Sequence, residues 1–212
     1  MGVITKGILG GFKGKVGTVV GANWKGIDTV RSMPSSVANP RTSGQMLNRG
    51  KFKMISMLAS TLLGNLVRPF WNGKNAKMSG YNSFIRANVE LGTTENTLVY
   101  PELKMATGSL EGVTLIDATA SNGSTEVSVE YDPNTGIGNA ASDDFVNAVV
   151  INATTGAIST SIKDAARPDS LITVTVPEVS TGDLLKVYVF ASKATDDKVV
   201  SNSVFLARTV TA

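Results

Sequence analysis

The chain has 212 residues and a formal net charge of +3, and 42% of its residues are hydrophobic, which is enough for a globular core. It contains neither cysteine nor histidine. This composition excludes disulfides, thiol nucleophiles, Ser-His-Asp triads and metal sites built on Cys or His.

The first informative stretch, residues 7–52, is rich in glycine and in β-branched residues. β-Forming runs flank Gly21-Ala22-Asn23 on both sides, and Trp24 follows directly. We expect a β-hairpin that turns at residues 21–23, with Trp24 near its turn. The glycines match neither the phosphate-loop nor the dinucleotide-binding pattern, so we interpret them as sites of close strand packing.

A basic helix is predicted next, from Thr42 or Ser43 to about Leu63. Thr42 is a good N-cap, and Gln45 stands at the capping-box position. One face carries apolar residues at helical spacing, and another carries Arg49 and Lys53, two like charges four residues apart. That face is either solvated or lies opposite an anionic partner. The apolar residues are Leu47, Met54, Ile55, Leu58 and Leu62.

A second helix is predicted from about Asn75 to Leu91, after a helix end or bend at Gly64 and a group of large apolar residues around Pro69. Polar, turn-rich residues 92–96 then mark a change in charge. Residues 1–92 hold thirteen basic and two acidic side chains, a net charge of +11, whereas residues 93–212 carry −8. We therefore predict two domains, residues 1–92 and 93–212. The asymmetry either attracts a partner or merely keeps two small domains in solution.

Beyond residue 92 the apolar period changes to two. In one run Val127, Val129 and Tyr131 point one way, and in another Ile172, Val174 and Val176 do so. Seven or eight short strands predict an immunoglobulin-like β-sandwich, so the fold class is α+β, a basic hairpin and helices followed by the sandwich. The runs are Leu98–Met105, Val113–Ala118, Glu126–Tyr131, Phe145–Ile151, Ala157–Ile162, Leu171–Val176, Leu185–Ala191 and Val199–Ala207.

No constellation for catalysis or metal binding is visible in the sequence. Asp143-Asp144 and Asp196-Asp197 are adjacent acidic pairs, which are typical of turns. The spaced oxygens of a calcium loop are missing. We expect no catalytic residue, no metal, no cofactor, no small-molecule substrate and no membrane partner, and we predict that the protein is not an enzyme.

The N-terminal stretch resembles known proteins in a series of short motifs. These are G-K-V-G at 14–17, W-K-G-I at 24–27, S-x-P at 32–34 and N-P-R-T at 39–42, followed by Gln45, Arg49, Lys51 and Phe52. The run is similar to an uncharacterised family of Bacteroidetes proteins, and virion-associated phage proteins carry a similar run. The resemblance covers roughly residues 5–110. It implies a structural or virion role and no catalytic residue.

Together these observations predict a structural subunit of a larger assembly, a phage virion component (head, head-tail or decoration) made in the host cytoplasm. The basic half would anchor it to other copies or other virion proteins, and a head-to-tail contact with the acidic half is favoured electrostatically. The alternative is a nucleic-acid-binding protein that uses the same basic half. Predicted contact residues for protein or anion are Trp24, Lys25, Arg31, Arg41, Arg49, Lys51, Lys53 and Trp71.

Overall fold

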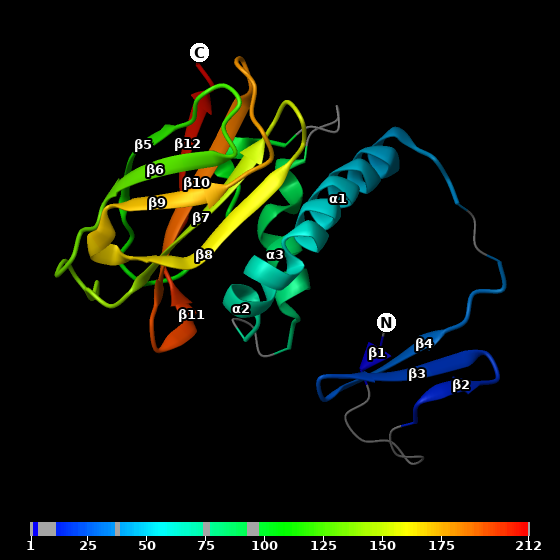
Figure 1. Cartoon of the computed structure of the whole chain (residues 1–212). Coiled ribbons are helices and arrows are strands. Elements are labelled where there is room, and N and C mark those ends of the chain that lie inside the picture. Colours follow the sequence, from blue (N-terminus) through cyan, green and yellow to red (C-terminus); the bar gives the residue numbers. More distant parts are fainter. Residues whose placement is uncertain (1, 4–11, 37–38, 74–76, 93–97, 212) are drawn as a thin grey trace.

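The computed structural model describes residues 2–3, 12–36, 39–73, 77–92 and 98–211. It is a mixed α+β protein dominated by antiparallel sheets, as the sequence predicts at that level (Figure 1). A small N-terminal sheet stands apart from a larger body, and the body consists of helices and two sheets (Figure 1).

The N-terminal sheet has the strand order β1-β4-β3-β2. Its strands are β1 (Gly2–Val3), β2 (Gly14–Val16), β3 (Val19–Trp24) and β4 (Ile27–Ser32). The expected hairpin forms, but its predicted turn at residues 21–23 is wrong because β3 continues through them. The chain turns at Lys25 and Gly26, both with positive φ, and Trp24 pairs with Ile27. A two-residue turn of this kind matches the right-handed twist of its strands.

Gly21 lies inside β3 because the neighbouring chain passes very close to it. A Cβ built there would clash with the backbone oxygen of Phe12. The glycine therefore allows close packing, as the sequence suggests, and not a turn. The first glycines of the glycine-rich stretch, at positions 7, 10 and 11, lie outside the described residues.

The helices follow an exposed connection. Helix α1 spans Ser43–Thr61, and the Thr42 hydroxyl accepts a hydrogen bond from Gln45 N, which confirms the predicted cap. Helical structure continues past Gly64 as a π-helical turn (Leu63–Val67) and α2 (Arg68–Trp71). Helix α3 spans Gly80–Asn88 with Ser79 as its cap, and a 3₁₀ turn (Val89–Leu91) follows. Residues 77–79 are not helical, so the second helix begins later than the predicted Asn75, at the cap that Ser79 provides. Residues 75–76 themselves lie outside the described residues.

The body contains a five-stranded and a three-stranded antiparallel sheet. The larger has the order β11-β10-β7-β8, with β12 also paired to β10, and the smaller has the order β5-β6-β9. The strands are β5 (Thr114–Thr119), β6 (Glu126–Asp132), β7 (Phe145–Asn152), β8 (Ile158–Ala166), β9 (Leu171–Thr175), β10 (Leu184–Lys193), β11 (Asp196–Val200) and β12 (Val204–Thr209).

Two predicted strands need correction. The run Leu98–Met105 is not a strand, because a 3₁₀ turn occupies Tyr100–Glu102, with Pro101 inside it. The run Val199–Ala207 is not one strand but the end of β11 and most of β12, separated near Ser201. The alternation predicted for β6 and β9 is confirmed, since Val127, Val129 and Ile172 are buried.

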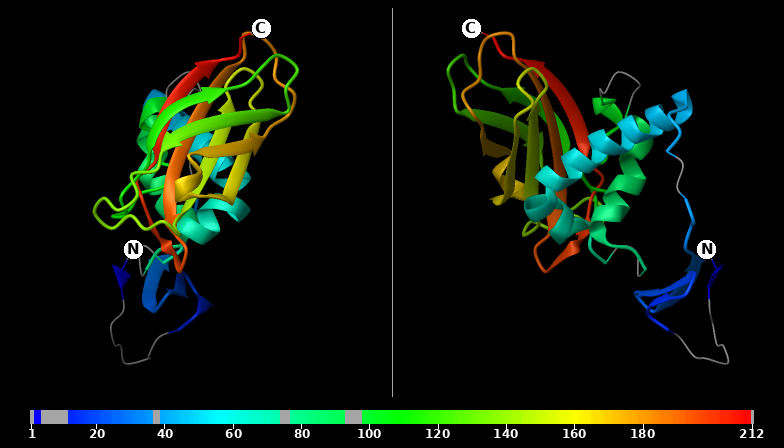
Figure 2. Two further views of the ribbon diagram at one scale, coloured as in Figure 1. Left: turned by 60° about the vertical axis from the view of Figure 1, so that its left-hand side comes forward. Right: turned by 90° about the vertical axis from the view of Figure 1, so that its right-hand side faces the viewer.

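The five-stranded sheet is covered on both faces, so the body has three layers (Figure 2). One face packs against the three-stranded sheet, and β7 contributes Val146, Ala148 and Val150 to that core. The other face packs against the helices, where the alternate β7 residues, such as Val149, meet Ile55 and its neighbours. The hydrophobic core thus crosses the predicted boundary at residue 92. Whether residues 1–92 and 93–212 fold independently of each other stays a prediction.

Candidate assembly interface

The N-terminal sheet has little of the cover that the sheets of the body have. In the described residues no helix or second sheet packs on it, and Figure 2 shows it projecting from the helix side of the body. Lys25 Nζ donates a hydrogen bond to Met78 O at 2.7 Å, which joins the tip of the hairpin to the body. In the described part of the sheet its large apolar side chains are therefore left exposed or half-buried.

The tip of the β3–β4 hairpin combines an aromatic ring with positive charge. Trp24 is 57% exposed, and Lys25 follows it in the turn. Arg31 is exposed further along β4. Val16 is 63% exposed on β2, whose outer edge is free of a strand partner within the described sheet. Exposed edges and exposed large apolar groups together are typical of protein–protein contacts.

The outward face of α1 repeats this combination. Arg49 and Lys53 are exposed there, as the sequence predicts, and Arg41 is exposed just before the cap. The Arg49 guanidinium donates to Asn39 Oδ1, so it also steadies the segment before the helix. The exposed apolar residues of this helix are Met46, Phe52 and Met57.

Two of the predicted contact residues have other roles. Trp71 is buried, its indole N–H donates to Met105 O at 2.8 Å, and its ring meets Phe84 edge-on with centroids 5.3 Å apart. Trp71 therefore belongs to the core, and its prediction as a contact residue is wrong, because it packs with the apolar residues around it. Lys51 forms an ion pair with Glu90 at 3.0 Å, which links α1 to the turn after α3.

The described residues therefore bring Trp24, Lys25 and Arg31 together on one small sheet, and Arg41, Arg49 and Lys53 along the start of α1. We call these two groups, with the exposed apolar residues beside them, the anchor surface. Sequence reasoning missed Val16, Met46 and Met57 as exposed members of it, although their apolar side chains on otherwise polar faces were a usable signal.

A second surface lies on the outer face of the three-stranded sheet. It is a shallow hollow of about 590 Å³, with Ile116 and Leu171 among its apolar lining residues and Glu130, Asp132 and Asp169 as its carboxylates. Its lining contains no lysine or arginine. Burial raises the pKa of the adjoining Tyr131 to about 12, and its hydroxyl donates to Ala166 O. The charge of the hollow at neutral pH is therefore that of its carboxylates.

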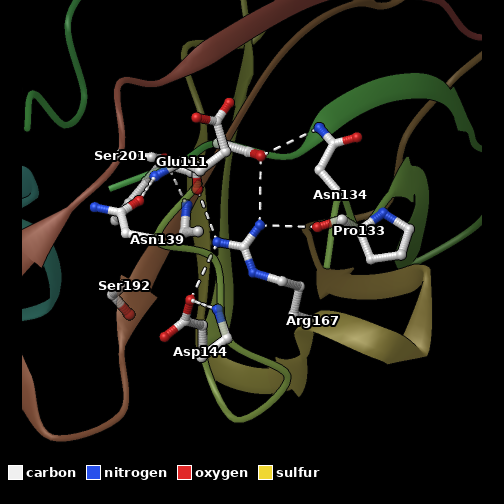
Figure 3. A network of polar contacts seen from close by, with 12 residues as sticks. Glu111, Pro133, Asn134, Asn139, Asp144, Arg167, Ser192 and Ser201 are labelled. Carbon is white, nitrogen blue, oxygen red and sulfur yellow. Dashed lines mark hydrogen bonds and ion pairs between the residues drawn. The ribbon is translucent and has the colours of Figure 1, made fainter. Parts of the chain in front are cut away.

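The other prominent polar group is a buried clamp around Arg167 (Figure 3). Its guanidinium donates to the backbone oxygens of Pro133 and Glu111, both at 2.8 Å, and pairs with Asp144 at 3.3 Å. Both side chains of the pair are fully buried. A buried ion pair with backbone carbonyl partners ties loops together, so we assign the clamp a structural role.

Two further kinds of site are absent from the described part of the chain. No group of three or more acidic side chains there is arranged to hold a metal ion. None of the described helices has the length and hydrophobicity that a membrane span requires.

Comparison with known proteins gives a family but no activity. The family model described as "Family of unknown function (DUF6266)" matches residues 11–207, and so includes most of the N-terminal sheet as well as the body. No curated protein matches the chain. Among solved structures, CopC from Methylosinus trichosporium OB3b is similar at 14% sequence identity and a TM-score of 0.30, over 47% of this chain and 93% of that one.

Proposed function

The chain belongs to the Family of unknown function (DUF6266), and on that premise we propose that it is a non-enzymatic structural subunit of a larger, repeated assembly. The observation that carries the proposal is the N-terminal sheet, which has exposed apolar residues and free edges but no covering layer in the described residues. A sheet of this kind gains stability when another chain covers it or extends it.

The charge distribution supports the same proposal. The anchor surface lies in the basic half of the chain, residues 1–92, and the two facing sheets lie in the acidic half, residues 93–212. Opposite charges steer copies together and select their orientation, while apolar contacts supply most of the affinity. The body, with a core of its own on both faces of the five-stranded sheet, can then project from the assembly as a rigid unit.

The finer form of the proposal is a phage virion protein of the head, the head-tail junction or the capsid decoration. Its support is the resemblance of the N-P-R-T run to virion-associated proteins. We further propose that the two facing sheets are an immunoglobulin-like sandwich, an architecture that supports many unrelated roles on exposed loops. The localisation that follows is the virion, after assembly in the host cytoplasm.

Size-exclusion chromatography with light scattering on the full chain tests the proposal. At tens of micromolar we expect a mass that is a multiple of the monomer's 22.2 kDa. Adding a charge at the anchor surface, as in Val16→Asp, should shift the mass toward the monomer. A wild-type chain that stays monomeric under these conditions would contradict self-assembly.

Nucleic-acid binding is the second candidate function. It is favoured by the exposed cations Arg41, Arg49 and Lys53 at the start of α1. Contacts to phosphate release counterions, so the logarithm of the affinity should fall linearly with the logarithm of salt concentration. Fluorescence anisotropy with labelled DNA, run on the sample used for light scattering, separates the two. Tight, salt-sensitive DNA binding by a strict monomer would reverse the ranking.

A further inference from the structure

We propose that the hairpin tip of one copy, Trp24-Lys25-Gly26, docks into the acidic hollow of a second copy, between Ile116 and Leu171 and against Glu130. This rests on the proposed function and specifies the contact that would join the subunits. The tip and the hollow are features of the same chain, so each copy offers one of each.

The hollow has the chemistry to receive an aromatic ring beside a cation. Ile116 is 56% exposed and Leu171 is 45% exposed, although both lie on strands whose other face packs into the core. Glu130 lies directly opposite Leu171 in the β6–β9 pairing, so a carboxylate and an apolar side chain are adjacent. An indole can cover the two apolar side chains while a neighbouring ammonium meets the carboxylate.

The charges around the hollow leave Glu130 available. The side chain of Asp132 accepts from Asn134 N, and that of Asp169 accepts from Ala166 N, so both are held by their own loops. The nearby cation Arg208 is paired with Asp117. In the described part of the chain the Glu130 side chain forms neither a hydrogen bond nor an ion pair. It is exposed and lines the hollow.

The hairpin tip is the matching feature. Trp24 is the exposed one of the two tryptophans, and the Lys25 ammonium donates to the neutral carbonyl of Met78. Exchanging that neutral acceptor for a carboxylate would add the attraction between opposite charges to the hydrogen bond. Tryptophan is also among the residue types most enriched at the energetic centres of protein interfaces.

The tip cannot use the hollow of its own chain. The hollow lies on the outer face of the three-stranded sheet, whereas the N-terminal sheet lies on the helix side of the body (Figures 1 and 2). The contact is therefore heterologous, joining different surfaces of two copies, and repeated contacts of this kind close into a ring or continue as a filament.

Complementation between two blocked variants tests the docking. The first, Trp24→Ala with Lys25→Glu, removes the tip, and the second, Ile116→Lys with Glu130→Lys, removes the hollow. By light scattering each variant alone should be a monomer. An equimolar mixture should form a dimer and nothing larger, because one intact tip meets one intact hollow.

A matched control is Glu126→Lys, which makes the same charge change on the same face of β6 but at the far end of the strand. It should keep the wild-type mass. Circular dichroism of every variant should match the wild type, because each substituted side chain is exposed at the surface.

The outcomes separate the docking from the proposed function. If the wild type is an oligomer and the hollow-blocked variant keeps its mass, the docking is overturned and the assembly role stands. If both variants are monomers but their mixture is too, the two surfaces do not meet, and the docking is again overturned. A monomeric wild type overturns both the docking and self-assembly.

Discussion

The N-terminal sheet and the five-stranded sheet are both antiparallel, yet they differ in what covers them. Each face of the five-stranded sheet has a hydrophobic core, one shared with the helices and one shared with the three-stranded sheet. In the described residues the N-terminal sheet has no such layer, and most of its side chains are exposed or half-buried. Local β-forming sequence is thus sufficient for a strand but does not determine where its apolar side chains find cover.

The largest expected effect comes from removing the helices. A chain that starts at residue 98 exposes the helix-facing side of the five-stranded sheet, including Val149, Tyr188 and Phe190. We expect it to lose cooperative thermal unfolding, measured by circular dichroism, because one of its two cores is gone. A chain that starts at residue 39 should keep a cooperative transition, since it lacks only the N-terminal sheet. A cooperative transition near the full chain's midpoint for residues 98–212 would instead support the predicted domain boundary.

The two tryptophans test the same difference between the sheets at single residues. Trp71→Ala should lower the free energy of unfolding by about 3–5 kcal/mol, because it leaves a cavity in the core and removes the hydrogen bond to Met105. Trp24→Ala should change it by less than about 0.5 kcal/mol, because that ring is exposed. Urea denaturation of both variants under conditions where the protein is monomeric measures the difference. Equal losses would mean that the N-terminal sheet is part of the body's cooperative unit.

The cap of α1 tests the junction between the two regions. Thr42→Ala should cost about 0.5–2 kcal/mol, at the low end because the hydrogen bond to Gln45 N is long, at 3.4 Å. The matched variant Ser43→Ala, one residue on inside the helix, should change stability by less. Denaturation that shows no loss for Thr42→Ala would place the start of α1 outside the cooperative body.

The smallest effect concerns the exposed ion pair between Asp117 and Arg208. The hydrogen bond from Arg208, helped by the backbone N–H of Ala118, lowers the pKa of Asp117. The pair therefore stabilises the fold above the ordinary aspartate pKa, and that contribution is lost as pH falls through the lowered value. Arg208→Gln should raise the pKa of Asp117 measured by NMR, with a stability loss below about 1 kcal/mol. An unchanged titration midpoint would show that the pair is not formed in solution.

The sequence predicts the elements whose signal is local. The alternation in β6 requires one face to be buried, and Thr42 caps its helix through a hydrogen bond three residues away. The amino-acid sequence does not reveal that the helices cover the five-stranded sheet. The clue was the long apolar run of β10, which is buried on both faces. The prediction of a strand at Leu98–Met105 is wrong for a related reason. Its apolar residues are buried because they pack into the core shared with the helices, and not because they pair in a sheet.

The candidate contact residues divide along the same line. Charged side chains such as Arg41 and Lys53 are costly to bury, so their exposure follows from their chemistry. Tryptophan is stable in either environment, so sequence alone assigned Trp24 and Trp71 the same role. The hollow depends on residues from three strands and a turn, whose proximity is a property of the fold.

The Arg167 clamp has a consequence for how fast the body unfolds. Its partners Asp144, Pro133 and Glu111 are 23, 34 and 56 residues away in the sequence. Each contact closes a long loop, so we expect the guanidinium to enter its site after the surrounding strands have paired. Contacts that are absent from the transition state affect the unfolding rate and leave the folding rate nearly unchanged. We therefore expect the clamp to lengthen the lifetime of the folded body more than it speeds its formation, and unfolding rates of an Arg167→Met variant would test this.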